Sequence, residues 1–166
     1  ARAARARREG EAAAQAGVRL VWEFEPGFWL NKPSEVLTLA QAVGHANFKL
    51  LFDTSHAYMG AVVGARQTGQ PERLAGGVAE YGLRLGEYIG HFHLIDSDGS
   101  LHHDETSTHA AFGEGRIDFV QVITALKPLV SDLPWWCVDF CFNPNTPTAG
   151  QDAVPFVRRL MQEMLT

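Results

Sequence analysis

The sequence contains few cysteines. Among its 166 residues only Cys137 and Cys141 are cysteines, and both lie in one apolar segment. If that segment is a strand, their Cα atoms are about 13 Å apart, whereas the Cα atoms of a disulfide lie within about 7 Å of each other. Without a second cysteine pair they also do not complete a cysteine-rich zinc site. We therefore expect reduced thiols and a cytoplasmic protein.

Long apolar runs and an excess of positive charge are also lacking. No run approaches the ~20 apolar residues that a membrane span needs, and the first residues, ARAARARREGEAAAQAG, contain no hydrophobic core of a secretory signal. There are 14 lysines and arginines against 19 acidic residues, which gives a net charge of −5. A general nucleic-acid binder carries a basic surface instead. The sequence therefore predicts neither a membrane partner nor a nucleic-acid partner.

The sequence does contain four apolar segments, each of a length suited to a buried strand, with helical patterns between them. Such alternation is typical of parallel strands joined by right-handed crossovers. Hydrophobic residues make up 46% of the chain, enough for one core, so we expect one α/β domain over residues 1–166. The predicted strands are residues 18–25 (VRLVWEFE), 48–54 (FKLLFDT), 89–96 (IGHFHLID) and 135–142 (WWCVDFCF).

Helix signals fill most of the remaining chain. We predict helices over residues 1–15, from Ser34 as a cap to Gly44, and over residues 78–88, 118–129 and 151–165. Residues 57–77 are rich in small residues and give no clear assignment. Residues 97–115 show no periodicity, and an irregular stretch of this length in a compact domain is usually functional or disordered. Its polar run of His102, His103, Asp104 and Glu105 is interpreted as a solvated loop rather than a metal site.

Each predicted strand delivers a carboxylate or a histidine near its C-terminal end. In parallel strands these ends share one edge of the sheet, which is where α/β barrels place their chemistry. Inward carboxylates in apolar strands repel one another unless a cation neutralises them. The alternative is that these polar residues bind no metal and only cap the loops that follow the strands. That alternative explains any one of them more readily than all four together. The candidate metal ligands are Glu25, Asp53, His93 and Asp139.

Four motifs resemble the xylose isomerase-like TIM-barrel superfamily, which includes sugar phosphate isomerases and epimerases, inosose dehydratases and endonuclease IV. They are WEFEP (22–26), DTSH (53–56), HFHLIDS (91–97) and FGEGRID (112–118). The resemblance implies the C-terminal half of a (β/α)8 TIM barrel, strands five to eight. It also implies one divalent metal held by Glu25, Asp53, His93 and the acidic residue of the last strand. Three carboxylates and an imidazole suit Mn²⁺, Mg²⁺, Co²⁺ or Zn²⁺.

The function implied by the resemblance is isomerisation or epimerisation of a sugar or sugar phosphate, a hydroxy-ketone, through an enediolate. Glu25 or Asp139 would move the proton at carbon. His56 would contact the substrate or a second metal, and His109 matches a histidine that precedes the G-E-G element in endonuclease IV. Lys32 and Arg116 are candidates to meet a phosphate at the mouth of the barrel. His56, His109, Lys32 and Arg116 are therefore the candidate substrate-binding residues.

Some features leave other functions open. Relatives usually have glutamate where this chain has Asp139, and the aspartate that accompanies the endonuclease histidine is replaced by Ser107. An inosose dehydratase-like lyase, an endonuclease IV-like phosphodiesterase and an inactive fragment or interaction module are therefore alternatives. A complete barrel needs ~250 residues. We expect the missing N-terminal half-barrel, or a homo-oligomer, to be needed, and the chain alone to be inactive.

Overall fold

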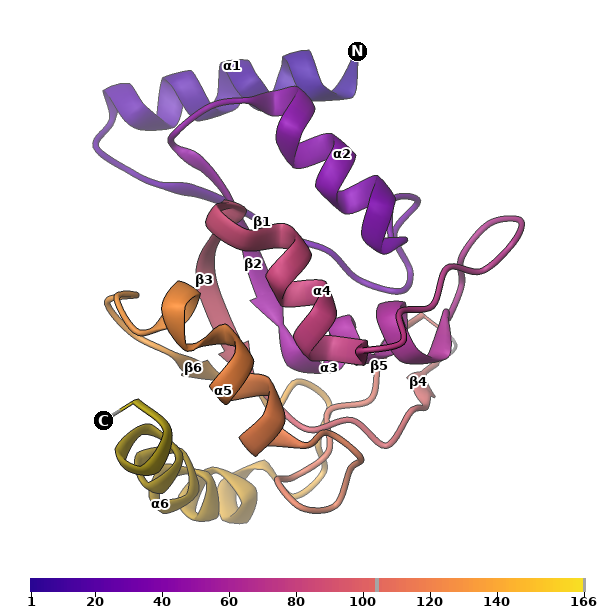
Figure 1. Cartoon of the computed structure of the whole chain (residues 1–166), viewed down its shortest axis with the longest axis vertical. Helices are drawn as coiled ribbons and strands as arrows, with labels where there is room; N and C mark the ends of the chain where they lie inside the picture. The colour runs from indigo at the N-terminus through magenta and orange to yellow at the C-terminus, as the bar shows by residue number, and fades with distance from the viewer. Residues whose placement is uncertain (104, 166) are drawn as a thin grey trace.

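The computed structural model describes residues 1–103 and 105–165 (Figure 1). Its main sheet has four parallel strands in the order β1-β2-β3-β6. Neighbours in the sheet are also neighbours in chain order, with helices between them, so the sheet curls as one half of a (β/α)8 barrel. This confirms the predicted fold class. The strands are β1 (Leu20–Glu23), β2 (Phe48–Asp53), β3 (Ile89–Leu94) and β6 (Cys137–Val138).

The part of the chain that the structure describes forms six α-helices. They are α1 (Arg2–Gln15), α2 (Pro33–Val43), α3 (Thr54–Tyr58), α4 (Gly77–Leu85), α5 (Phe119–Val130) and α6 (Thr146–Leu165). A π-helical turn, η1 (Met59–Val63), follows α3, and a 3₁₀ turn, η2 (Gly86–Tyr88), follows α4. Within residues 97–115, which we expected to be irregular, β4 (Leu101–His102) and β5 (Thr106–Ser107) form a short antiparallel pair. No described helix combines the length and apolarity needed to cross a membrane.

The helix boundaries follow from local capping. Helix α2 begins at Pro33, one residue before the predicted Ser34 cap, because proline suits the first helical position. The Glu35 carboxylate accepts the Lys32 N–H at 3.3 Å, and Gly44 ends the helix with a left-handed φ of 53°. Helix α5 begins after Asp118, whose carboxylate accepts the Gln121 N–H at 2.9 Å. Capping therefore sets where each connection turns back toward the sheet.

The strands are shorter than predicted because side chains divert the backbone at their ends. The Asp53 carboxylate caps α3 directly after β2. After β3, the Ile95 N–H donates to Thr54 Oγ1 at 2.9 Å instead of extending the sheet. After β6, Asp139 Oδ1 accepts the Cys141 N–H at 2.9 Å, and this Asx turn ends the strand. Strands β2, β3 and β6 therefore end at the polar residues that follow their apolar segments.

Helices α4 and α5 lie against one face of the main sheet (Figure 1), and the hydrophobic core lies between the sheet and the helices on this face. Phe52 of β2 stacks on Phe92 of β3 at 6.0 Å between ring centroids. Tyr81 brings α4 onto this layer, 5.1 Å from Phe24 and 5.9 Å from Phe52. Because side chains alternate along a strand, burying Phe92 turns His91 and His93 to the opposite, barrel-facing side of the sheet.

A buried carboxylate organises the loop that follows β3. Asp96 is 2% exposed and accepts the N–H groups of Ser97 at 2.8 Å, Gly113 at 3.0 Å, Gly115 at 3.0 Å and Ile117 at 3.1 Å. A Cβ atom at position 115 would overlap this carboxylate, so only glycine fits there. The G-E-G element is therefore a backbone cradle for Asp96, which joins both ends of residues 97–115.

Candidate metal centre

Four side chains, one from each of β1, β2 and β3 and one from the residue directly after β6, converge on the barrel-facing side of the sheet. One ligand atom from each lies within 4.8 Å of the others. Asp53 and His93 are in register across β2 and β3, while Glu23 pairs with Leu51, two residues before Asp53. The longer glutamate side chain compensates for this lower starting level. The group, which we call the carboxylate–histidine cluster, consists of Glu23, Asp53, His93 and Asp139.

The spacing of this cluster suits a shared ion. His93 Nδ1 lies 3.5 Å from Glu23 Oε1, 3.8 Å from Asp53 Oδ2 and 3.7 Å from Asp139 Oδ2. These separations are too long for hydrogen bonds. Two ligands that each lie about 2.1 Å from one ion are about 3.0 to 4.2 Å apart, depending on the angle between them. All three distances fall within that range, so the donor atoms match a common cation.

Several atoms of the cluster also lack partners. Glu23 Oε1, Asp53 Oδ2 and His93 Nδ1 are buried without a hydrogen bond to any described residue. The other oxygen of Asp53 accepts the N–H groups of Ser55 at 2.8 Å and His56 at 2.9 Å, which fixes the orientation of the carboxylate. Buried polar atoms without partners are costly. A divalent ion, with oxygen-rich ligation, satisfies all three atoms at once, so the residues present fit such a group.

The pKa shifts within the carboxylate–histidine cluster also favour a bound cation. Burial, with the nearby charge of Asp53, raises the pKa of Glu23 to about 7. Burial opposes the charge on His93, but contact with Asp139 and the charges of Asp53 and Glu23 outweigh it and raise the His93 pKa. Contacts with His109 and His93 hold the pKa of Asp139 well below its usual range. Bound protons thus offset the crowded negative charge, and a cation can replace them.

A second group of buried side chains borders this cluster. Asp53, His56 and His109 each contribute a ligand atom within 4.8 Å of the others. His109 is 3% exposed, its Nδ1 lies 3.8 Å from Asp139 Oδ1, and neither ring nitrogen has a hydrogen-bond partner among the described residues. His56 Nε2 lies 3.7 Å from Glu23 Oε1, and burial lowers the His56 pKa. Both predicted substrate-binding histidines therefore lie beside the candidate metal position.

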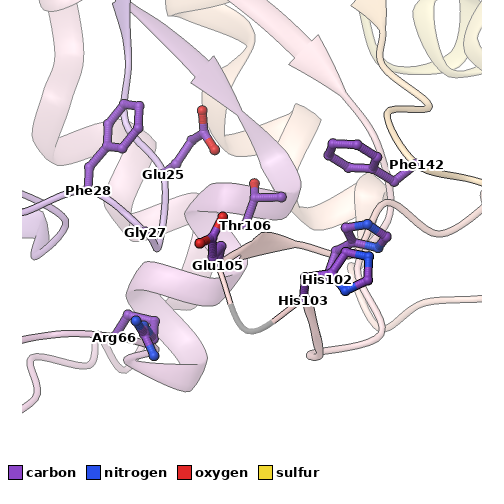
Figure 2. Close-up of a pocket in the computed structure, with 9 residues that line it drawn as sticks. All are labelled: Glu25, Gly27, Phe28, Arg66, His102, His103, Glu105, Thr106 and Phe142. Atoms are coloured by element: carbon purple, nitrogen blue, oxygen red, sulfur yellow. The ribbon is translucent and has the colours of Figure 1, made fainter.

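Glu25, which we predicted as a ligand, lies outside the carboxylate–histidine cluster. It belongs to a neighbouring group with Glu23 and His56. The two glutamates share a strand face in the sequence pattern, but Glu23 Oε1 is the carboxylate oxygen that lies 3.5 Å from His93 Nδ1, and Glu25 comes after β1 has ended. Beyond the end of β1, Glu25 instead lines a pocket of about 470 Å³ (Figure 2).

This pocket combines aromatic and polar walls. Phe28 and Glu25 lie on one side, and His102 and Phe142 on the other (Figure 2). The His102 and Phe142 rings stack at 4.3 Å with an interplanar angle of 4°. The sequence pattern had indicated a solvated loop for this polar run, whereas the structure places part of it on the pocket wall; Asp104 lies outside the described residues. The pocket is lined by Glu25, Gly27, Phe28, Arg66, His102, His103, Glu105, Thr106 and Phe142.

Backbone strain gathers at the same pocket. In residues 1–103 and 105–165, only three residues other than glycine have left-handed φ angles: Arg66 at 57°, His103 at 49° and Phe142 at 61°. All three line the pocket. Such conformations are uncommon for residues with a Cβ atom and concentrate at ligand sites. Their coincidence at one cavity favours a binding function for it.

The two basic residues predicted to contact a phosphate lie elsewhere. Lys32 Nζ donates to the Gln70 carbonyl at 2.9 Å. Arg116 lines a separate cavity of about 190 Å³, which also involves Tyr58 and Gln121. Neither lines the pocket beside Glu25. A phosphate contact by Lys32 or Arg116 stays a prediction.

The chain matches the family described as xylose isomerase-like TIM barrel over residues 2–158. It therefore belongs to this family, as the motifs had indicated. No curated protein sequence gives a significant match.

Three solved structures of similar fold have sequence identities to this chain below 25%. A xylose isomerase-like TIM barrel protein from Mycobacterium smegmatis, in complex with magnesium, superposes with a TM-score of 0.72 at 15% identity, covering 99% of this chain and 50% of that one. D-allulose 3-epimerase from Methylomonas sp. gives 0.68 at 19% identity, with 95% and 54% covered. A D-tagatose 3-epimerase-like protein gives 0.62 at 22% identity, with 93% and 52% covered. The chain thus spans about half the length of these proteins.

Proposed function

We propose that the chain carries the metal-binding half of the active site of a divalent-metal-dependent sugar isomerase or epimerase. The observation that carries this proposal is the convergence of three buried, unpartnered atoms at the C-terminal ends of parallel strands, on Glu23, Asp53 and His93. Family membership and the fold shared with sugar 3-epimerases support it. Glu23, Asp53, His93 and Asp139 would hold Mn²⁺, Mg²⁺, Co²⁺ or Zn²⁺. Such an ion, when bound, orients adjacent oxygens of a hydroxy-ketone and polarises its carbonyl.

Proton movement at carbon falls to a carboxylate that can reach the substrate. Glu25 lies between the carboxylate–histidine cluster and the pocket, because it groups with Glu23 and His56 and also lines the cavity. From there it can remove a proton from the carbon beside the carbonyl and return it to the neighbouring carbon or to the other face. An enediolate then connects substrate and product. Asp139 is the other candidate for this role, since its side chain is about one-third exposed.

His56 has a defined orientation for this task. Its Nδ1 lies 2.7 Å from Ser107 Oγ, Ser107 Oγ lies 2.9 Å from Ser55 Oγ, and Ser55 Oγ lies 3.2 Å from the Thr108 carbonyl oxygen. A carbonyl only accepts. Ser55 has one hydroxyl proton, which either Ser107 or this carbonyl can accept; we propose that the carbonyl accepts it, so that Ser107 donates to Ser55 and His56 Nδ1–H donates to Ser107. This chain of donors leaves the lone pair of His56 Nε2 directed at the cluster, ready to accept a substrate hydroxyl proton.

The pocket beside Glu25 suits a sugar. Phe28 and the stacked pair of His102 and Phe142 supply apolar faces, and Glu105 and Thr106 supply hydrogen-bonding groups. Small-ligand sites combine such aromatic walls with a few polar groups. We propose that the end of the substrate distant from the reacting carbons lies in this pocket. The turnover assay described below decides whether the substrate is a ketose or a ketose phosphate.

The remaining half of the barrel belongs to the proposal as well. Because the chain covers about half of the structures it resembles, a substrate held from both sides requires strands from another segment or a second copy. Positioning of reacting atoms contributes much of the rate. We expect turnover once that half is supplied and none from the 166 residues alone. A cytoplasmic location stays a prediction from the reduced thiols.

The test compares two matched substitutions, Glu23→Gln and Glu25→Gln. Metal content after dialysis and turnover of a panel of ketoses and ketose phosphates are measured, with the missing half-barrel supplied. We expect Glu23→Gln to lose the metal and Glu25→Gln to keep it while losing turnover. Retention of stoichiometric metal by Glu23→Gln together with its loss in Glu25→Gln would reverse the ligand assignment. A wild-type protein that binds no divalent ion would overturn the proposal.

A phosphodiesterase with more than one metal is the second candidate, favoured by the group of Asp53, His56 and His109. Two metals per chain and loss of one of them in His56→Ala would support it. One metal per chain, retained in His56→Ala with loss of sugar turnover, supports the epimerase instead. The net charge of −5 disfavours a nucleic-acid substrate.

A further inference from the structure

A group of a different chemical kind lies on the same sheet face as the carboxylate–histidine cluster, two residues nearer the N-terminal ends of the strands. His91, His93 and Cys137 each provide a ligand atom, and the three atoms lie within 4.8 Å of one another. His91 and His93 alternate along β3, and Cys137 is paired in register with His93 across to β6. All three side chains are partly exposed, so an ion can reach them.

The distances match a tetrahedral ion. Cys137 Sγ lies 3.5 Å from His91 Nε2. A thiolate about 2.3 Å and an imidazole about 2.05 Å from one Zn²⁺ ion, at the tetrahedral angle, are about 3.5 to 3.6 Å apart. The Cys137 sulfur and the His91 nitrogen are therefore already at the separation that two ligands of one tetrahedral ion have. The His91 and His93 rings lie 5.1 Å apart between centroids, inclined at 72°, so both rings border the same small space.

The donor set differs from the first cluster in kind. One sulfur and imidazole nitrogens favour thiophilic ions such as Zn²⁺, whereas the carboxylate oxygens of the first cluster favour harder ions such as Mg²⁺ or Mn²⁺. We infer that His91, His93 and Cys137 form a binding site for a thiophilic divalent ion, different in its donor atoms from the proposed active-site metal site and sharing His93 with it.

Binding at this site has a defined proton balance and a defined consequence. Cys137 loses its S–H proton to solvent on coordination, and water completes the fourth position, as in zinc sites with three protein ligands. His93 belongs to both groups. Its Nδ1 faces Glu23, Asp53 and Asp139. A thiophilic ion that moves the His93 ring toward His91 and Cys137 would therefore remove the only nitrogen ligand from the carboxylate–histidine cluster. Saturation with Zn²⁺ should therefore weaken binding of the harder ion.

Cobalt titration of the purified, reduced protein tests the inference directly. A thiolate bound to Co²⁺ gives an intense near-ultraviolet charge-transfer band, which oxygen and imidazole ligands do not give. We expect this band in the wild type and in Cys141→Ser, whose exposed thiol serves as the matched control. We expect none in Cys137→Ser and a weaker one in His91→Ala. Added Zn²⁺ should remove the band at one equivalent.

One further variant separates this site from the proposed function. Asp139→Asn removes a carboxylate of the first cluster and leaves every ligand atom of the second, so it should keep the band even where the harder ion is lost. Absence of the band from the wild type overturns the inference, whatever the variants do. So does a band that disappears in Cys141→Ser but persists in Cys137→Ser. Neither result depends on measuring sugar turnover.

Discussion

Ser107 Oγ lies 2.7 Å from Nδ1 of His56, and both side chains are buried. This contact joins residues that are 51 positions apart and connects the loop after β3 to the helix after β2. Ser107 stands where an endonuclease-like motif has an aspartate. A hydroxyl there, unlike a carboxylate, positions the ring without adding charge, and a neutral His56 agrees with its lowered pKa.

We predict that Ser107→Ala leaves metal content unchanged and lowers kcat by about 10- to 100-fold, the usual range for partners that orient a site residue. Ser107→Thr, which keeps the hydroxyl, should restore most of the rate. Nitrogen chemical shifts of the His56 ring should show the Nδ1–H tautomer in the wild type and a tautomer mixture in Ser107→Ala. An unchanged tautomer in that variant, or a loss of metal, would contradict the positioning role.

Metal affinity should rise with pH. The raised pKa values of Glu23, about 7, and of His93 mean that the metal-free protein holds protons that its unfolded chain would release. Their stabilising contribution is present below the ordinary pKa values and is lost as pH rises through the raised ones. A cation must displace these protons, so we expect up to ~10-fold higher affinity per pH unit per displaced proton between about pH 5.5 and 8.

Isothermal titration in buffers of different ionisation enthalpy measures the protons released. Glu23→Gln should bind weakly and with a flatter pH dependence, because one displaced proton is missing. The metal-free protein should melt at a lower temperature as pH rises over the same interval. Metal affinity that does not change with pH would show that Glu23 and His93 carry no displaceable protons.

The sequence pattern was sufficient for the sheet and for the expectation that Asp53, His93 and Asp139 lie together at its edge, because strand alternation and parallel order are local signals; their role as metal ligands stays a prediction. It was not sufficient to choose between Glu23 and Glu25. Both lie on one face of VRLVWEFE, and only the positions of their carboxylates in space show that Glu23 is the one that reaches His93. The pocket wall was missed for a similar reason, since the stacking of His102 on Phe142 joins distant segments through left-handed backbone that no local pattern specifies.

Tyr81 carries a hydroxyl that the core does not need. The side chain is 0% exposed, and its oxygen has no hydrogen-bond partner among the described residues. An unpartnered buried hydroxyl costs about 1 to 3 kcal/mol. We predict that Tyr81→Phe raises the free energy of unfolding by about 1 kcal/mol, measured by urea denaturation. Tyr81→Leu, the control, should lower it by roughly 2 kcal/mol because the ring contacts with Phe24 and Phe52 are lost.

Asp96 should be among the most sensitive positions for stability. Its buried carboxylate accepts four backbone N–H groups, those of Ser97, Gly113, Gly115 and Ile117, and these span the whole loop that carries Ser107 and His109. Hydrogen bonds to a charged group contribute about 1.5 to 3 kcal/mol each, and the donors left behind in a buried site add a desolvation cost. We predict that Asp96→Ala lowers the free energy of unfolding by roughly 3 to 5 kcal/mol.

Two further variants make this last prediction specific. Asp96→Asn keeps the shape and one accepting oxygen but turns an N–H₂ group toward backbone donors, so its loss should lie between those of wild type and Asp96→Ala. Asp98→Ala removes an acceptor only from the local turn at Ser100, where it accepts at 2.8 Å and 2.7 Å, and should cost less than about 1 kcal/mol. Urea denaturation gives all three values, and limited proteolysis within residues 97–115 reports the loop itself. Equal losses in Asp96→Ala and Asp98→Ala would show that the loop is held by its own turns and not by the buried carboxylate.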